Sequence, residues 1–97
     1  MPINQWPQDE RPREKLLARG AKNLSDAELV AIFLRTGSRG QTAVDLARDL
    51  MNEFGGLKKL LNAAPPVLFK KRGLGKAKYA AVKAAVELGL RYYDEVV

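Results

Sequence analysis

KKRGLGKAK, residues 70–78, is the stretch on which the predicted fold depends. A short helix is expected to lead into it, and a long helix is expected to begin at about Lys76. Between the two helices lies Gly-Leu-Gly, and Gly73 and Gly75 permit a sharp turn with positive φ because they carry no Cβ. The stretch therefore predicts two helices joined by a tight, glycine-containing turn.

The same stretch has the features of an anion-binding site. The first N–H groups of a helix that begins at Lys76 have no partner within the helix, and the positive end of the helix dipole lies there. Flanking cations add to this field, so a phosphate group suits the site. The candidate phosphate-binding residues are Lys71, Arg72, Gly73, Leu74, Gly75, Lys76 and Lys78. The alternative is a structural corner, with glycine for geometry and lysine for solubility.

The net charge of +6 is unevenly distributed along the chain. Residues 1–56 hold eight cations and eight acids, whereas residues 57–97 hold nine cations and three acids, a net charge of +6. The whole excess of positive charge thus lies in the half that contains Gly-Leu-Gly. A local positive field of this kind favours a polyanionic partner.

The composition excludes several classes of protein. Ninety-seven residues allow one small domain, and a hydrophobic content of 46% is ordinary for a globular chain. The chain has no cysteine and no histidine, so we expect no disulfide, no metal site and no cofactor. No apolar run reaches the roughly 20 residues of a membrane span, and the first residues do not resemble a signal peptide. We therefore expect a cytoplasmic protein with no membrane partner.

Caps and breakers define the first part of the chain. Residues 1–10 show no periodicity and are expected to form an irregular arm, whereas residues 11–97 are expected to form one helical domain. Pro12 suits the first turn of a short helix, and Gly20 suits the position just past its end.

A second helix is predicted after Ser25. Ser25 and Glu28 have the spacing of a capping box, in which each side chain hydrogen-bonds to the backbone of the other. The helix that follows is apolar on most sides and ends near Arg35. We predict that it is the most buried helix, with Leu29 and Ile32 in the core.

Helical spacing continues through the second half of the chain. It predicts a helix over residues 43–54, ended by Gly55-Gly56, and a helix of about two turns over residues 57–61. The last helix is predicted from about Lys76 to Tyr93, with Lys83 solvated. Its apolar stripe consists of Tyr79, Val82, Val86, Leu90 and Tyr93. The prediction is an all-α bundle of five or six short helices, with helix–turn–helix units at residues 26–54 and 66–93.

A second glycine-containing turn follows the Ser25 helix. Arg35, Gly37, Arg39 and Gly40 make it a candidate second anion site, although a turn that needs glycine for its geometry is the favoured interpretation. Carboxylates elsewhere are scattered over helix faces, and no nucleophile has a base beside it. We therefore expect that the chain is not an enzyme.

The quoted stretch also fits a known DNA-binding pattern. Gly73-Leu74-Gly75 and Val82 match the helix-hairpin-helix motif, which binds DNA without sequence specificity. Lys71 and Tyr79 depart from it, since an apolar residue and a small residue are usual at these two positions. The departures bear on how tightly the two helices pack.

Motifs along almost the whole chain, from about Trp6 to Tyr93, resemble the amino-terminal region of the bacterial RadC family, whose name refers to DNA repair. The motifs are Arg11-Pro12-Arg13-Glu14-Lys15-Leu16-Leu17, Leu24-Ser25-Asp26-Ala27-Glu28-Leu29, Phe33-Leu34-Arg35-Thr36-Gly37, Arg39-Gly40, Asp45-Leu46-Ala47, Phe54-Gly55-Gly56-Leu57, Gly73-Leu74-Gly75-Lys76-Ala77-Lys78 and Glu87-Leu88-Gly89. The resemblance implies a non-catalytic accessory domain that contacts the backbone phosphates of duplex or branched DNA.

The resemblance also implies a second domain beyond this sequence. In the RadC family a carboxy-terminal, metalloprotease-like domain of the JAB/MPN type follows, and its zinc site needs histidines that this chain lacks. Any zinc-dependent hydrolysis would therefore belong to that second domain. The alternative function is a protein-interaction module that docks onto the second domain or onto another partner.

Overall fold

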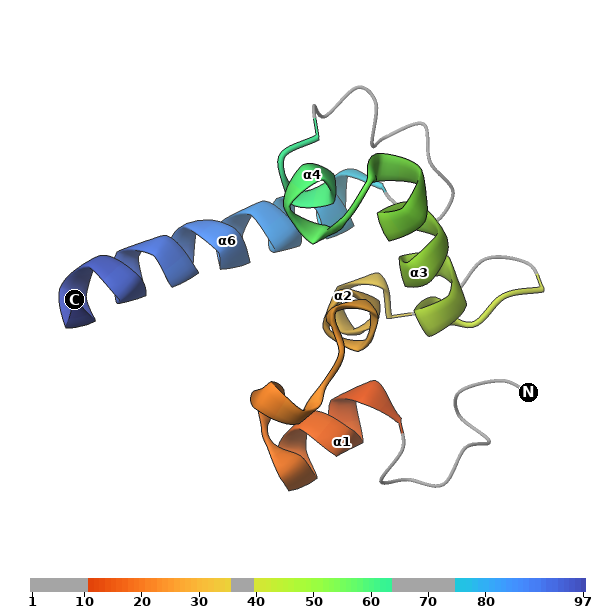
Figure 1. The fold of residues 1–97 in the computed structure, drawn as a ribbon, viewed down its shortest axis with the longest axis horizontal. Helices are drawn as coiled ribbons and strands as arrows, with labels where there is room; N and C mark the ends of the chain where they lie inside the picture. The colour runs from red at the N-terminus through yellow and green to blue at the C-terminus, as the bar shows by residue number, and fades with distance from the viewer. Residues whose placement is uncertain (1–10, 36–39, 64–74) are drawn as a thin grey trace.

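The computed structural model describes residues 11–35, 40–63 and 75–97. Within these ranges the chain forms five α-helices, one short 3₁₀ helix and no strand, so the predicted all-α class is confirmed (Figure 1). The elements are α1 (Pro12–Arg19), η3 (Ala21–Asn23), α2 (Asp26–Leu34), α3 (Ala43–Phe54), α4 (Leu57–Leu61) and α6 (Lys76–Val96). The predicted arm of residues 1–10 and the helix predicted to lead into Gly-Leu-Gly lie outside the described residues.

The predicted ends of α1 are confirmed. Pro12 is its first residue, where a missing N–H costs no helical hydrogen bond. Gly20 follows its last residue with φ of 86°, and the Gly20 N–H donates to the carbonyl of Leu16 at 2.8 Å. A side chain at this φ is strained, which explains why glycine stands there.

Both central helices begin with a capping box. The Ser25 hydroxyl accepts from the Glu28 amide at 3.2 Å, and the Glu28 carboxylate accepts from the Ser25 amide at 2.9 Å, as predicted. Thr42 and Asp45 form the same arrangement at the start of α3, with distances of 3.1 and 3.5 Å. This second box was not predicted, although the spacing Thr-x-x-Asp is its signal in the sequence.

The core lies where α2 packs against α3, with α4 closing one side (Figure 1). Small residues of α2 at i and i+4 let the two helices approach closely. The buried residues of this core are Ala27, Ala31 and Leu34 of α2, Ala43, Val44, Leu46, Ala47 and Leu50 of α3, and Leu60 of α4.

The prediction that α2 is the most buried helix is confirmed among the described helices, but the placement of Leu29 and Ile32 is corrected. Only one of the nine residues of α2 is exposed, against five of the twelve residues of α3, yet Leu29 and Ile32 are half-buried and lie outside the buried core. The reason is that a helix that is apolar on most sides buries only the sides that have neighbours. Here the stripe of Ala27, Ala31 and Leu34 joins α3 in the core and leaves Leu29 and Ile32 on other sides.

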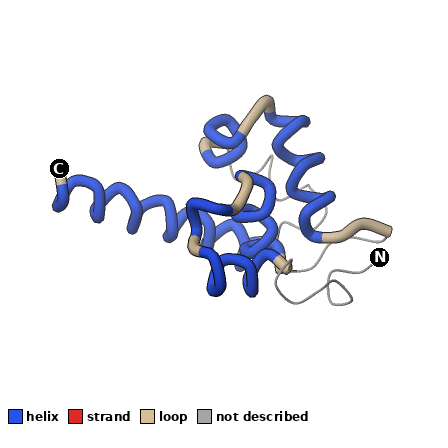
Figure 2. Tube along the Cα trace, turned by 60° about the horizontal axis from the view of Figure 1, so that its bottom comes forward, coloured by secondary structure: helices blue, strands red, loops and turns tan. Residues whose placement is uncertain are grey.

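The long last helix is confirmed. It begins at Lys76, as predicted, and ends at Val96 rather than near Tyr93, so with 21 residues it is the exception to the predicted bundle of short helices. Its amino-terminal half contacts α2 and α4, whereas its carboxy-terminal half extends away from the other helices (Figures 1 and 2). The helix predicted over residues 57–61 is confirmed as α4, and its five residues make fewer than two turns.

Candidate nucleic-acid interface

The amino-terminus of α6 is the described part of the predicted phosphate site. Gly75 is the N-cap residue, with φ of −89° and ψ of 177°, and no side chain caps the helix there. The first intrahelical bond runs from the Tyr79 N–H to the Gly75 carbonyl at 3.0 Å. The amides of Lys76, Ala77 and Lys78 therefore lack a partner within the helix and point outward from its positive end.

The structure corrects the reason given for Gly75. Its φ is negative and close to the values of −71° at Ser25 and −79° at Thr42, which any residue can adopt. A Cβ built at Gly75 would meet nothing within 4 Å. A side chain would therefore fit at this position, and what the glycine contributes in the described geometry is the absence of a side chain that could cap the helix.

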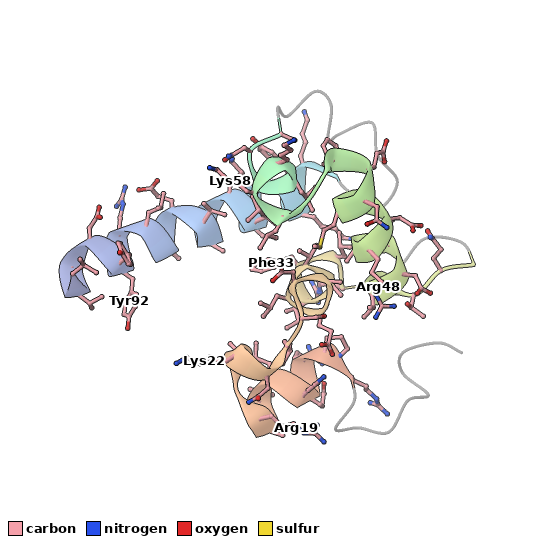
Figure 3. The ribbon with its side chains drawn as sticks, in the orientation of Figure 1. Arg19, Lys22, Phe33, Arg48, Lys58 and Tyr92 are labelled. Atoms are coloured by element: carbon pink, nitrogen blue, oxygen red, sulfur yellow. The ribbon has the colours of Figure 1, made fainter. Side chains whose placement is uncertain are left out.

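Lysines are present on α6 and on α4, which contacts it. Lys76 in the first turn of α6 is exposed and Lys78 is half-buried. Lys58 and Lys59 are exposed on α4, which contacts α6, and Figure 3 shows Lys58 projecting from that helix. The predicted site residues Lys71, Arg72, Gly73 and Leu74 lie outside the described residues.

Lys83 is not solvated, contrary to the prediction. Its side chain is half-buried, its Nζ donates to the carbonyl of Leu61 at 2.9 Å, and the same Nζ lies 6.0 Å from the centroid of the Tyr79 ring. Leu61 is the last residue of α4, so its carbonyl has no partner within that helix. Lys83 therefore ties α6 to α4 and positions the amino-terminus of α6.

The second candidate anion site is described only in part. Arg35 is the exposed C-cap of α2, with φ of 66° and ψ of −49°, and its N–H donates to the Ala31 carbonyl at 2.9 Å. Gly40 has φ of 77°. Gly37 and Arg39 lie outside the described residues. The described geometry accounts for Arg35 and Gly40 as turn residues.

Lys15 has a structural role. Its Nζ lies 3.0 Å from the Glu28 carboxylate, and both side chains are largely shielded from solvent. Burial alone would raise the pKa of Glu28, but hydrogen bonds from the Ser25 amide, Lys15 and the Ser25 hydroxyl, with the charge of Lys15, lower it below its usual value. The ion pair joins α1 to α2, so this cation belongs to the fold and not to a ligand site.

The described residues contain no candidate metal site and no candidate membrane-spanning helix. Over residues 11–35, 40–63 and 75–97, no group of three or more His, Cys, Asp or Glu side chains is placed to hold a metal ion. Over the same ranges, no helix combines the length and the apolar character needed to cross a membrane.

Comparison with known proteins identifies a family. The model of the UPF0758 N-terminal domain matches residues 3–80. The chain belongs to the UPF0758 family. UPF0758 proteins of Thioalkalivibrio sulfidiphilus and Azotobacter vinelandii are 62% and 58% identical to it, each over 95 residues and 98% of the chain. A UPF0758 protein of Chromohalobacter salexigens is 58% identical over the whole chain.

The match covers less than half of each relative. The chain spans 43% of the length of the Thioalkalivibrio and Chromohalobacter UPF0758 proteins and 42% of the Azotobacter one. No solved structure matches the chain.

Proposed function

We propose that this UPF0758 domain is a non-catalytic, RadC-like accessory domain that binds DNA through backbone phosphates at the amino-terminus of α6. The observation that supports it is the uncapped start of α6 at Gly75, with the exposed Lys76 directly after it. Exposed lysines on α4, a helix in contact with α6, add to the positive charge of the same pair of helices. Amides and lysines bind phosphate oxygens whatever the neighbouring base. The domain is therefore expected to bind DNA of any sequence.

The charge distribution supports the same proposal. The net charge of +6 arises wholly from residues 57–97, and α4 and α6 are the described helices of that half. A polyanion is attracted to this half by the long-range field and then held by short-range contacts at the helix start.

A second function, docking onto another part of the protein, is favoured by the large apolar side chains exposed on the far half of α6. This surface lies at the opposite end of the same helix from Gly75. The two functions are therefore compatible, and they are tested by different variants.

The proposal is tested by fluorescence anisotropy with duplex, single-stranded and branched DNA over a series of salt concentrations. The logarithm of the affinity should fall linearly with the logarithm of the salt concentration. Lys76→Ala and Lys58→Ala should each flatten this plot by up to about 0.9, the value for one phosphate on duplex DNA. Each variant should weaken the binding of all sequences alike.

Lys22→Ala is the matched control. Lys22 is exposed on η3, away from α6 (Figure 3). The substitution Lys22→Ala therefore removes the same charge as Lys76→Ala, but from a different part of the molecule. Lys15 is unsuitable as a control because its loss would break the ion pair with Glu28. Equal effects of Lys22→Ala and Lys76→Ala, or no DNA binding by the parent chain at low salt, would overturn the proposal.

A further inference from the structure

The last part of α6, residues 87–97, forms an arm that extends beyond the rest of the molecule (Figures 1 and 2). Every residue of the arm is exposed. Leu88 is 68% exposed and Leu90 57% exposed, and Figure 3 shows the Tyr92 side chain in a region that no other described helix occupies. Large apolar side chains in such positions usually mark a contact surface.

The arm has two distinct faces. On a helix with 100° between successive residues, the apolar residues cover more than half of the circumference. They are Leu88, Leu90, Tyr92, Tyr93, Val96 and Val97. The charged residues Glu87, Arg91, Asp94 and Glu95 share the remaining face, where Arg91 Nε donates to the Glu87 carboxylate at 2.9 Å. The arm is thus amphipathic, with an apolar face that no described residue covers.

The apolar face continues a surface that already packs within the domain. Tyr79, Val82 and Val86 line an apolar groove of about 250 Å³ together with residues of α2 and α4. Leu90 and Tyr93 follow Val86 in the same stripe, at spacings of four and three residues. One continuous apolar surface therefore runs from the groove onto the arm.

The arm gains no stability from packing within the described residues. It continues a helix whose first half is already packed, so it propagates without a new nucleation step, but most helical stability in proteins comes from packing an amphipathic face. The UPF0758 relatives are more than twice as long as this chain, since it spans 43% of two of them, and the matching family model is that of an N-terminal domain. In these relatives, sequence that follows the N-terminal domain is tethered to it, and tethering gives that sequence a high effective concentration at the surface of the domain.

We infer that the apolar face of the arm docks onto the part of the UPF0758 protein that lies beyond this chain. The charges of the arm favour this occupant over a membrane, because its polar face carries three acids and one arginine, whereas helices that lie on membranes are rich in cations. The inference deepens the second proposed function, docking, and rests on it. It concerns a different surface from the proposed phosphate site, so its failure would leave the DNA-binding proposal standing.

The test compares hydrogen exchange in two proteins, the full-length Thioalkalivibrio sulfidiphilus relative and the 97-residue chain. Amides aligned with residues 88–97 should exchange at least tenfold more slowly in the full-length relative. Substitutions equivalent to Leu90→Asp and Tyr93→Asp in that relative should restore fast exchange. The matched controls, equivalent to Glu87→Gln and Asp94→Asn, should leave the slow exchange unchanged.

Each other result overturns the inference. Equally fast exchange in both proteins would mean that the arm is not covered, and slow exchange that survives Leu90→Asp would mean that only a longer helix protects it. Protection of the 97-residue chain that rises with its own concentration would assign the face to a second copy. Protection that requires anionic vesicles would assign it to a membrane. Amides of α2 and α3 report in the same data whether each variant is folded.

Discussion

Gly75→Asp is the substitution that separates the folding of α6 from the binding of phosphate. The backbone at Gly75 already has the extended φ and ψ of an N-cap, as at Ser25 and Thr42. At those two caps a side-chain oxygen accepts from the amide of the third helical residue at 3.2 and 3.1 Å. An aspartate at position 75 should accept from the Lys78 amide in the same way and occupy the site in place of phosphate.

The two effects of this variant have opposite signs. Aspartate is a better N-cap than glycine by a few tenths of a kcal/mol, and loss of glycine from the unfolded chain adds about 0.4–1 kcal/mol of stability. For a domain of this size, the sum corresponds to a Tm higher by roughly 2–11 °C. A hydrogen bond to a charged group contributes about 1.5–3 kcal/mol, so DNA affinity should fall roughly ten- to a hundredfold.

Differential scanning calorimetry and fluorescence anisotropy measure the two effects on the same samples. Gly75→Asn supplies an equivalent cap without charge, and Gly89→Asp adds the same charge at an exposed glycine of the same helix, where a Cβ meets nothing within 4 Å. If Gly75→Asp binds DNA as the parent does, or if Gly89→Asp weakens binding equally, the amides after Gly75 do not hold phosphate.

Three further predictions concern packing, pH and backbone strain. Leu34→Ala should lower the free energy of unfolding by about 3–5 kcal/mol, because Leu34 is 1% exposed. Half-buried Ile32→Ala should cost roughly 1–2 kcal/mol, and equal losses in urea titrations would contradict the packing. Because the pKa of Glu28 is lowered from 4.5 on folding, the stability it contributes is present above pH 4.5 and is lost as the pH falls through the lower, folded value. Glu28→Gln should remove that part of the pH dependence, and an unchanged acid limb of the stability curve would argue against the ion pair. Arg35→Gly should raise the stability by about 1 kcal/mol by relieving the positive φ of 66°, and an unchanged Tm would show that the turn is unstrained.

Helix ends were predictable because a cap depends on residues that are adjacent in sequence. Ser25 and Glu28 need only each other to form a capping box, and Gly20 needs only the end of the helix before it. The capping box of Thr42 and Asp45 depends on an equally local pattern, so it too was predictable from the sequence. The fold class followed from the same local patterns.

Burial was less predictable because it depends on which face of a helix packs against another helix in the tertiary structure. The pattern of α2 is apolar on most sides, so it does not distinguish Ala31, which is buried, from Ile32, which is half-exposed. Lys83 has the sequence context of a solvated lysine, and only the placement of α4 brings the Leu61 carbonyl to it. The stripe of α6 continues past Val86 at regular spacing, although no described helix packs against it there.

In the candidate site, too, the local features could be predicted and the tertiary ones could not. The glycines, the start of the helix and the neighbouring cations could all be identified from the sequence. The φ of Gly75 was not, because glycine adopts positive and negative values with similar ease. The lysines of α4 were missed as well, since their proximity to α6 is a property of the tertiary structure.

The double role of Glu28 has a consequence for how the domain opens. Its one carboxylate caps α2 through the Ser25 amide and also holds α1 through Lys15. Detachment of α1 therefore removes Lys15 from the Glu28 carboxylate that caps α2. Fraying of the first turn of α2 in turn displaces this carboxylate and weakens its ion pair with α1. The two segments are thermodynamically linked, so they should open together as one cooperative unit with a single free energy, rather than as two independently fraying ends.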